Sequence, residues 1–179
     1  MVKGIETRNF DSAMKAAALA GSEGFKWGAI SGAVVGGASK AILLNRPIPS
    51  PRKAELDALA TYGGSDQLSY INGTEVPFGT PGSTRPDVVR NVGGVLEAIE
   101  VKCYNLQGSA NRGVLKSELI RQISQRSADL PNGSLQRIVL NVQGRGYSKQ
   151  FASETISWIQ DFCNPFYPNI PVDIMGAVL

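Results

Sequence analysis

The chain has 179 residues, of which 42% are hydrophobic, and a formal net charge of +3. This length suits one domain with an appendage and is sufficient to bury a hydrophobic core. The sequence contains no histidine, which excludes a histidine-dependent catalytic triad, a histidine-based zinc site and the histidine chemistry of HNH-type nucleases. Two cysteines, Cys103 and Cys163, lack metal-ligand spacing, and we interpret them as core thiols with a disulfide as the alternative.

The first 50 residues differ in composition from the rest of the chain. Residues 11–20 have the pattern of a helix, and residues 27–44 are rich in glycine, alanine and serine, with Lys40 as their one charged residue. Small residues allow close helix–helix contact. We expect no stable membrane span, because the apolar run reaches the thickness of a bilayer only if Lys40 lies near one end. No signal peptide is recognised at the start, and three prolines in residues 45–51 predict an extended linker.

A second helix is predicted over residues 50–60, because the serine at its start is a good N-cap and the proline that follows suits the first turn. Residues 67–71 and 74–78 then predict a hairpin around Asn72-Gly73, which is a strong type I′ turn signal. These elements lead into the part of the chain that carries the strongest chemical signal.

Residues 95–104 alternate as a strand, so that Glu100 and Lys102 share one face within an apolar run. A carboxylate and an ammonium in such a setting are costly unless they pair or bind a ligand. Residues 91–94 indicate a turn, and a hairpin through this turn would bring Asp87 near Glu100 and Lys102.

Two carboxylates and a lysine at one end of a hairpin suit metal-assisted phosphodiester hydrolysis. Carboxylate oxygens bind a hard divalent cation, which polarises the phosphate and lowers the pKa of a bound water. The lysine can orient that water or offset charge that develops on the phosphate. The alternative is a surface hairpin in which Glu100 pairs with Lys102 and Asp87 caps a turn.

The rest of the chain predicts an amphipathic helix over residues 114–126, a strand over residues 136–142, a helix over residues 149–162 and a short strand over residues 172–175. This element order predicts an α+β or mixed α/β domain with a central mixed sheet flanked by helices. Basic residues in this part favour binding of a polyanion such as nucleic acid, with a solvated helix face as the alternative. They are Arg112, Lys116, Arg121, Arg126, Arg137, Arg145 and Lys149. Of these, Lys116, Arg121 and Arg126 are predicted to lie outside the apolar stripe of the helix over residues 114–126.

Pro86-Asp87 followed by Glu100-Val101-Lys102 resembles the PD-(D/E)xK signature of restriction-endonuclease-like nucleases. Longer segments around it are similar to the nuclease toxin domains at the C-terminal ends of bacterial polymorphic toxins, which include contact-dependent growth inhibition, Rhs and LXG-type effectors. The resemblance covers about residues 51–160. It is carried by residues 62–64, 67–73, 75–77, 79–87, 97–106, 130–133 and 136–145.

The resemblance implies a restriction-endonuclease-like nuclease toxin domain over residues 51–179, behind a helical segment over residues 1–50 that serves entry into a target cell or linkage. The expected substrate is DNA, with tRNA as the alternative. The resemblance also implies a parent toxin delivery protein, action in the target-cell cytoplasm and a cognate immunity protein, which should be acidic if it covers a basic surface. The competing hypotheses are a non-catalytic nucleic-acid-binding domain and a membrane-active toxin formed by the first 50 residues.

For the site, the leading hypothesis is that Asp87 and Glu100 bind Mg²⁺ or Mn²⁺, with Zn²⁺ as an alternative and the Val101 carbonyl as a third ligand. Lys102 would assist the attacking water. Two further residues complete the expected set of catalytic and phosphate-binding groups. They are Gln143, which would face the scissile phosphate unless it is only an edge-of-sheet polar residue, and Glu55, which the resemblance implies could join the metal site from the preceding helix.

Overall fold

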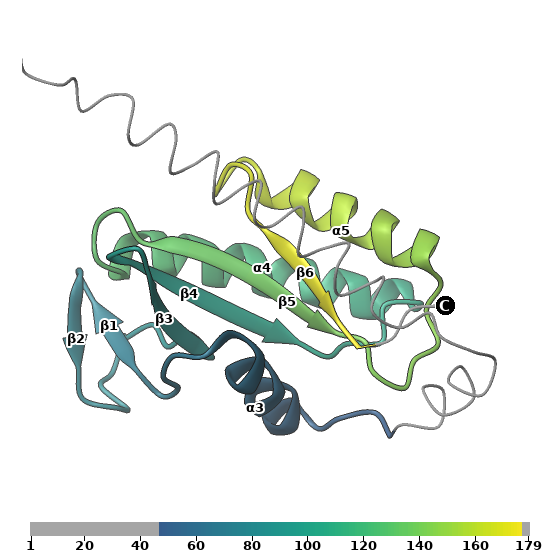
Figure 1. Cartoon of the computed structure of the whole chain (residues 1–179). Helices are drawn as coiled ribbons and strands as arrows, with labels where there is room; N and C mark the ends of the chain where they lie inside the picture. The colour runs from purple at the N-terminus through teal and green to yellow at the C-terminus, as the bar shows by residue number, and fades with distance from the viewer. Residues whose placement is uncertain (1–46, 177–179) are drawn as a thin grey trace, which may run out of the picture. The chain divides into compact units, whose positions relative to one another are not determined.

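The computed structural model describes residues 47–176. The predicted helix over residues 11–20 and the glycine- and alanine-rich run over residues 27–44 lie outside this range. The described chain is an α+β fold (Figure 1). Its helices are α3 (Pro51–Tyr62), α4 (Ser109–Asp129) and α5 (Lys149–Cys163). Its strands are β1 (Ser69–Ile71), β2 (Thr74–Val76), β3 (Val88–Val92), β4 (Val95–Lys102), β5 (Leu135–Asn141) and β6 (Val172–Met175).

The strands form two sheets. A four-stranded mixed sheet has the order β3-β4-β5-β6, in which β3 is antiparallel to β4 while β4, β5 and β6 are parallel. The β1-β2 hairpin is a separate two-stranded sheet. Parallel neighbours need long crossover connections, and α4 and α5 supply them. The predicted central mixed sheet flanked by helices is confirmed in the part of the chain that the structure describes.

Local chemistry sets the boundaries of several elements as predicted. The Ser50 side chain accepts a hydrogen bond from the Lys53 backbone N–H at 3.2 Å and caps α3, whose first residue is a proline. The β1-β2 turn is formed by Asn72 and Gly73, with φ of 49° and 79°, which are the two positive values that a type I′ turn requires. Gly64 is needed for close approach, because an added Cβ would lie 2.3 Å from the Val89 carbonyl oxygen.

The helices cover opposite faces of the mixed sheet (Figure 1). On one face, α4 and α5 pack on the apolar side chains of β5 and β6, with Leu119, Ile138 and Ile159 fully buried. On the other face, α3 packs through Ala54 and Ala58 on β3 and β4. β4 is therefore covered on both faces, and the charged residues that it carries are removed from water. No helix of the described residues is long and apolar enough to cross a membrane.

The β1-β2 hairpin lies against the end of α4. The Gly73 N–H donates to the Asp129 carbonyl at 2.8 Å, and Tyr70 packs with Leu130 and Val89 in a third small apolar cluster. Tyr70 and Thr84 also exchange two backbone hydrogen bonds of 2.9 Å. This pairing holds the loop before β3 between the hairpin and α4. The backbone of the segment that precedes Asp87 is thereby held in place.

Candidate functional site

Asp87 lies immediately before β3, at the edge of β4. Its backbone N–H donates to the Ile99 carbonyl at 3.1 Å, and its side-chain Oδ2 accepts from the Val101 N–H at 2.7 Å. The β3-β4 register pairs Val88 with Ile99, so Asp87 lies opposite Glu100 one residue further along. The hairpin thus brings Asp87 to Glu100, as the sequence predicts.

Glu100 is buried, with 3% of its surface exposed, and two cations bind it. Its Oε1 lies 2.6 Å from Lys102 Nζ, and its Oε2 forms an ion pair with Arg126 of α4. Burial alone would raise the pKa of the Glu100 carboxyl, but Arg126 and Lys102 outweigh it and hold that pKa below its ordinary value. Glu100 is therefore an anion. Each of its oxygens has two lone pairs and so can accept from one more group.

Lys102 is held by a second carboxylate that the sequence analysis did not select. Its Nζ lies 2.9 Å from Glu118 Oε1, and the Tyr104 hydroxyl donates to Glu118 Oε2 at 2.7 Å. Burial would lower the pKa of Lys102, but Glu100 and then Glu118 outweigh it, so that the pKa is raised. Lys102 is thus a fixed ammonium between two carboxylates. It is suited to offset negative charge, and not to accept a proton.

The Asp87 carboxyl has a pKa raised to about 7. Burial is the largest cause and the charge of Glu100 the next, while the Val101 N–H and then Arg126 act in the opposite direction. Glu55 of α3 adds a smaller raising effect, which places its charge within electrostatic range of Asp87. Glu55 itself is paired with Arg52 at 2.9 Å.

In the described part of the chain, no hydrogen bond or ion pair joins the predicted phosphate-binding residue Gln143 to Asp87, Glu100 or Lys102. Its side-chain amide donates to the Pro47 carbonyl at 3.1 Å. It lines a separate cavity with Lys53 and Asp57 of α3. We therefore leave Gln143 out of the site that Asp87, Glu100 and Lys102 form.

The predicted basic surface is smaller than the sequence indicates. The prediction that Arg126 lies outside the apolar stripe of its helix is wrong, since 3% of it is exposed and it pairs with Glu100. Arg137 is partly buried, with 11% of its side chain exposed, and its guanidinium forms ion pairs with Glu97 and Asp173. Arg112 is half-buried and donates to the Leu106 backbone carbonyl at 2.7 Å. Arg145 is also half-buried and donates to the Cys103 backbone carbonyl. The residues of the predicted set that remain exposed are Lys116, Arg121 and Lys149.

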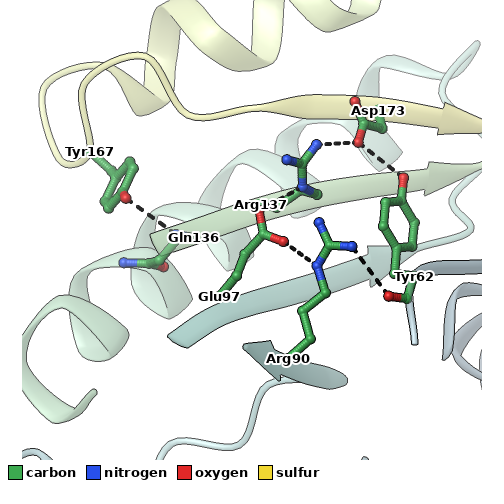
Figure 2. Close-up of polar contacts among 7 residues, drawn as sticks. All are labelled: Tyr62, Arg90, Glu97, Gln136, Arg137, Tyr167 and Asp173. Carbon is green, nitrogen blue, oxygen red and sulfur yellow. Dashed lines mark hydrogen bonds and ion pairs between the residues drawn. The ribbon is translucent and has the colours of Figure 1, made fainter. Parts of the chain in front are cut away.

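A second charged cluster crosses the opposite face of the sheet, on the side of α3 (Figure 2). Arg90 of β3, Glu97 of β4, Arg137 of β5 and Asp173 of β6 alternate in charge from one strand to the next. Glu97 accepts from Arg90 at 2.5 Å and from Arg137 at 2.9 Å, and Arg137 also binds Asp173. The Tyr62 hydroxyl donates to Asp173 at 3.0 Å, and burial, with the nearby Asp173 charge, raises the pKa of Tyr62. We interpret this row as a structural ion network, because two arginines balance two carboxylates within it.

The two thiols are free and lie on opposite faces of the sheet, so they do not form a disulfide with each other. Cys103 packs in the apolar cluster beneath α3, whereas Cys163 of α5 is buried in the cluster on the other face of the sheet. Burial raises the pKa of the Cys163 thiol to about 12. The interpretation as a buried core thiol is confirmed for Cys163, whereas Cys103 is half-buried, and the disulfide alternative is wrong.

The donor set around Asp87 bears on the predicted metal. The described residues contain no group of three or more His, Cys, Asp and Glu side chains placed to hold an ion together. Asp87, Glu100 and the Val101 carbonyl offer oxygen donors alone, as Mg²⁺ and Mn²⁺ prefer, and Mg²⁺ is commonly bound through one or two carboxylates with water and substrate phosphate. The residues fit such an ion better than Zn²⁺, which favours nitrogen and sulfur ligands.

Comparisons of the chain with family models, with curated proteins and with solved structures find no match.

Proposed function

We propose that residues 51–179 are a metal-dependent nuclease domain of the restriction-endonuclease-like class that acts as a toxin. The observation that carries the proposal is the convergence of Asp87, Glu100 and Lys102. Asp87 lies opposite Glu100 across the β3-β4 hairpin, and Lys102 binds Glu100 at 2.6 Å. A buried Glu100 and a half-buried Asp87 beside an ammonium are typical of an active site, because a structural ion pair of Glu100 with Lys102 would not need the second carboxylate.

The roles follow from the contacts. Asp87 and Glu100, with the Val101 carbonyl, would hold Mg²⁺ or Mn²⁺, which supplies Lewis-acid polarisation of the phosphate when bound. Lys102 offsets the negative charge that develops on the phosphate, because its raised pKa keeps it protonated. Glu118 is a positioning residue, since it fixes Lys102 from α4 at 2.9 Å. Glu55 adds negative potential from α3.

Nuclease activity is tested by incubating the purified chain with plasmid DNA and, separately, with total tRNA, in Mg²⁺, Mn²⁺, Zn²⁺ or EDTA. We expect cleavage of one substrate with Mg²⁺ or Mn²⁺, with DNA favoured over tRNA, and none in EDTA. Cleavage that persists in EDTA would reject the metal-dependent mechanism. Binding of both nucleic acids with no cleavage under any condition would instead support the non-catalytic binding domain.

A nuclease toxin of this kind requires an inhibitor in the cell that makes it. We propose an acidic immunity protein, because complementary charge raises the association rate. Of the basic residues predicted from the sequence, Lys116 and Arg121 of α4 and Lys149 of α5 remain exposed for it to contact. Its association should slow at high salt, and an association rate independent of salt would reject docking on these residues.

A further inference from the structure

A polar cavity of about 330 Å³ lies beside the site formed by Asp87, Glu100 and Lys102 (the Asp87 group), and between the loop that precedes β3 and helix α4. Arg85 of the loop and Arg121 and Arg126 of α4 line it, together with Ser69 of β1. Arg126 joins this cavity to the site already described, because its guanidinium also pairs with Glu100. Arg85 lies two residues before Asp87, so the cavity and the carboxylates share one stretch of chain.

Three buried polar atoms of the residues that line the cavity lack hydrogen-bond partners among the described residues. They are the Nε of Arg126, the hydroxyl of Ser69 and the side-chain Oε1 of Gln122, and Arg126 and Ser69 are only 3% and 1% exposed. Leaving buried polar groups unpaired is costly. Two of these atoms, the Arg126 Nε and the Ser69 hydroxyl, can donate, and together with the two exposed arginines at the same cavity they favour an anion as its ligand.

An exposed aromatic ring stands next to this cavity. Phe78 is 62% exposed, and the Arg85 guanidinium lies 4.9 Å from the centre of its ring. Proteins that bind single-stranded nucleic acid combine an exposed aromatic ring with cationic side chains, because a base stacks on the ring while a phosphate binds the cations.

We propose that this cavity binds a phosphate group of the nucleic acid substrate, next to the phosphodiester that is cleaved at the Asp87 group, and that Phe78 stacks on a neighbouring base. Arg85 and Arg121 bind the phosphate, and Arg126 supplies buried positive charge behind it. The proposal rests on the proposed function, in which the substrate is a nucleic acid. It adds a binding site that determines the path of the substrate backbone across the protein.

The experiment measures binding, in EDTA, by the full chain to a labelled single-stranded oligonucleotide and to inorganic phosphate. The double variant Arg85→Gln/Arg121→Gln should lose at least about tenfold in affinity for the oligonucleotide, and its salt dependence should fall by about one unit of slope. Binding of inorganic phosphate should also be lost. Lys53→Gln, which removes an exposed charge from α3, is the matched control and should change neither affinity.

A second variant separates the stacking ring from the phosphate pocket. Phe78→Leu should lower affinity for the oligonucleotide by about fivefold or more while leaving phosphate binding unchanged. The proposal is overturned if the double variant binds the oligonucleotide as the wild type does, or if it loses phosphate alone, which would indicate a site for free phosphate. If oligonucleotide binding depends on the two arginines but no metal-dependent cleavage occurs, the phosphate pocket is supported and the proposed nuclease activity is rejected. If cleavage occurs but binding does not depend on the arginines, the nuclease activity is supported and the phosphate pocket is rejected.

Discussion

Asp87→Asn should abolish cleavage while leaving the free energy of unfolding unchanged or higher. We expect loss of activity of at least about a hundredfold, the scale on which removal of one group that stabilises developing charge lowers kcat. Stability should survive, because burial and the charge of Glu100 both disfavour the Asp87 anion in the folded protein. The asparagine oxygen can still accept from the Val101 N–H, which Asp87 binds at 2.7 Å.

The measurement compares cleavage rates and chemical denaturation of the wild type and the variant. Glu75→Gln removes an exposed carboxylate of β2 and is the control, with no expected change in either quantity. An Asp87→Asn protein that is folded and fully active would show that this carboxylate is not catalytic. A variant that unfolds would show that the residue is instead needed to cap the edge of β4.

Arg126→Met should destabilise the fold by about 3–5 kcal/mol, the cost of breaking a buried ion pair by removing one partner. Arg126 and Glu100 are both about 3% exposed, so the variant leaves Glu100 buried with Lys102 as its one remaining cation. Arg121→Met, on the exposed face of the same helix, should change stability by less than about 0.5 kcal/mol. Urea denaturation of both variants gives these values.

The double variant Arg126→Met/Glu100→Gln tests whether the cost arises from the pair. It should be less destabilised than the sum of its two single variants, because residues in direct contact are not additive. A loss of under 1 kcal/mol in Arg126→Met, or strict additivity in the double variant, would contradict the buried pair and support the original prediction of a surface arginine.

The elements that the sequence predicts well are those set by local chemistry. Residues 95–102 alternate and follow a glycine turn, so strand β4, its hairpin partner and the approach of Asp87 to Glu100 all follow from neighbouring residues. The Asn72-Gly73 turn and the Ser50 cap are equally local. The pairing of Glu100 with Lys102 follows from their positions two residues apart on one face of a strand.

The residues that α4 contributes to the candidate site, Glu118 and Arg126, reach it through contacts between distant parts of the chain. Arg126 lies three residues after Ile123, and Glu118 three residues after Leu115, so both continue the helical face that meets the sheet. That spacing was a signal that they face inward. The charge of Arg126 favours the opposite expectation of an exposed side chain, because a buried arginine is explained only by a partner such as Glu100, which is 26 residues away.

The ion network on the opposite face could not be predicted from the sequence either, because it also depends on contacts between distant parts of the chain. Arg137 meets Glu97 and Asp173 only once β5 is paired in parallel with both β4 and β6. No local pattern gives the register between strands joined by long crossovers. Charge counting therefore assigned Arg137 to a nucleic-acid surface, whereas the register places it between two carboxylates.

The most direct test of the central claim is the position of Mn²⁺ in crystals of the chain, located by anomalous diffraction. The account predicts a peak within coordination distance of the carboxylates of Asp87 and Glu100 and of the Val101 carbonyl, and no such peak in crystals of Asp87→Asn. A well-occupied ion held elsewhere, for example at Glu97 and Asp173, with none at Asp87, would contradict the assignment of the catalytic site.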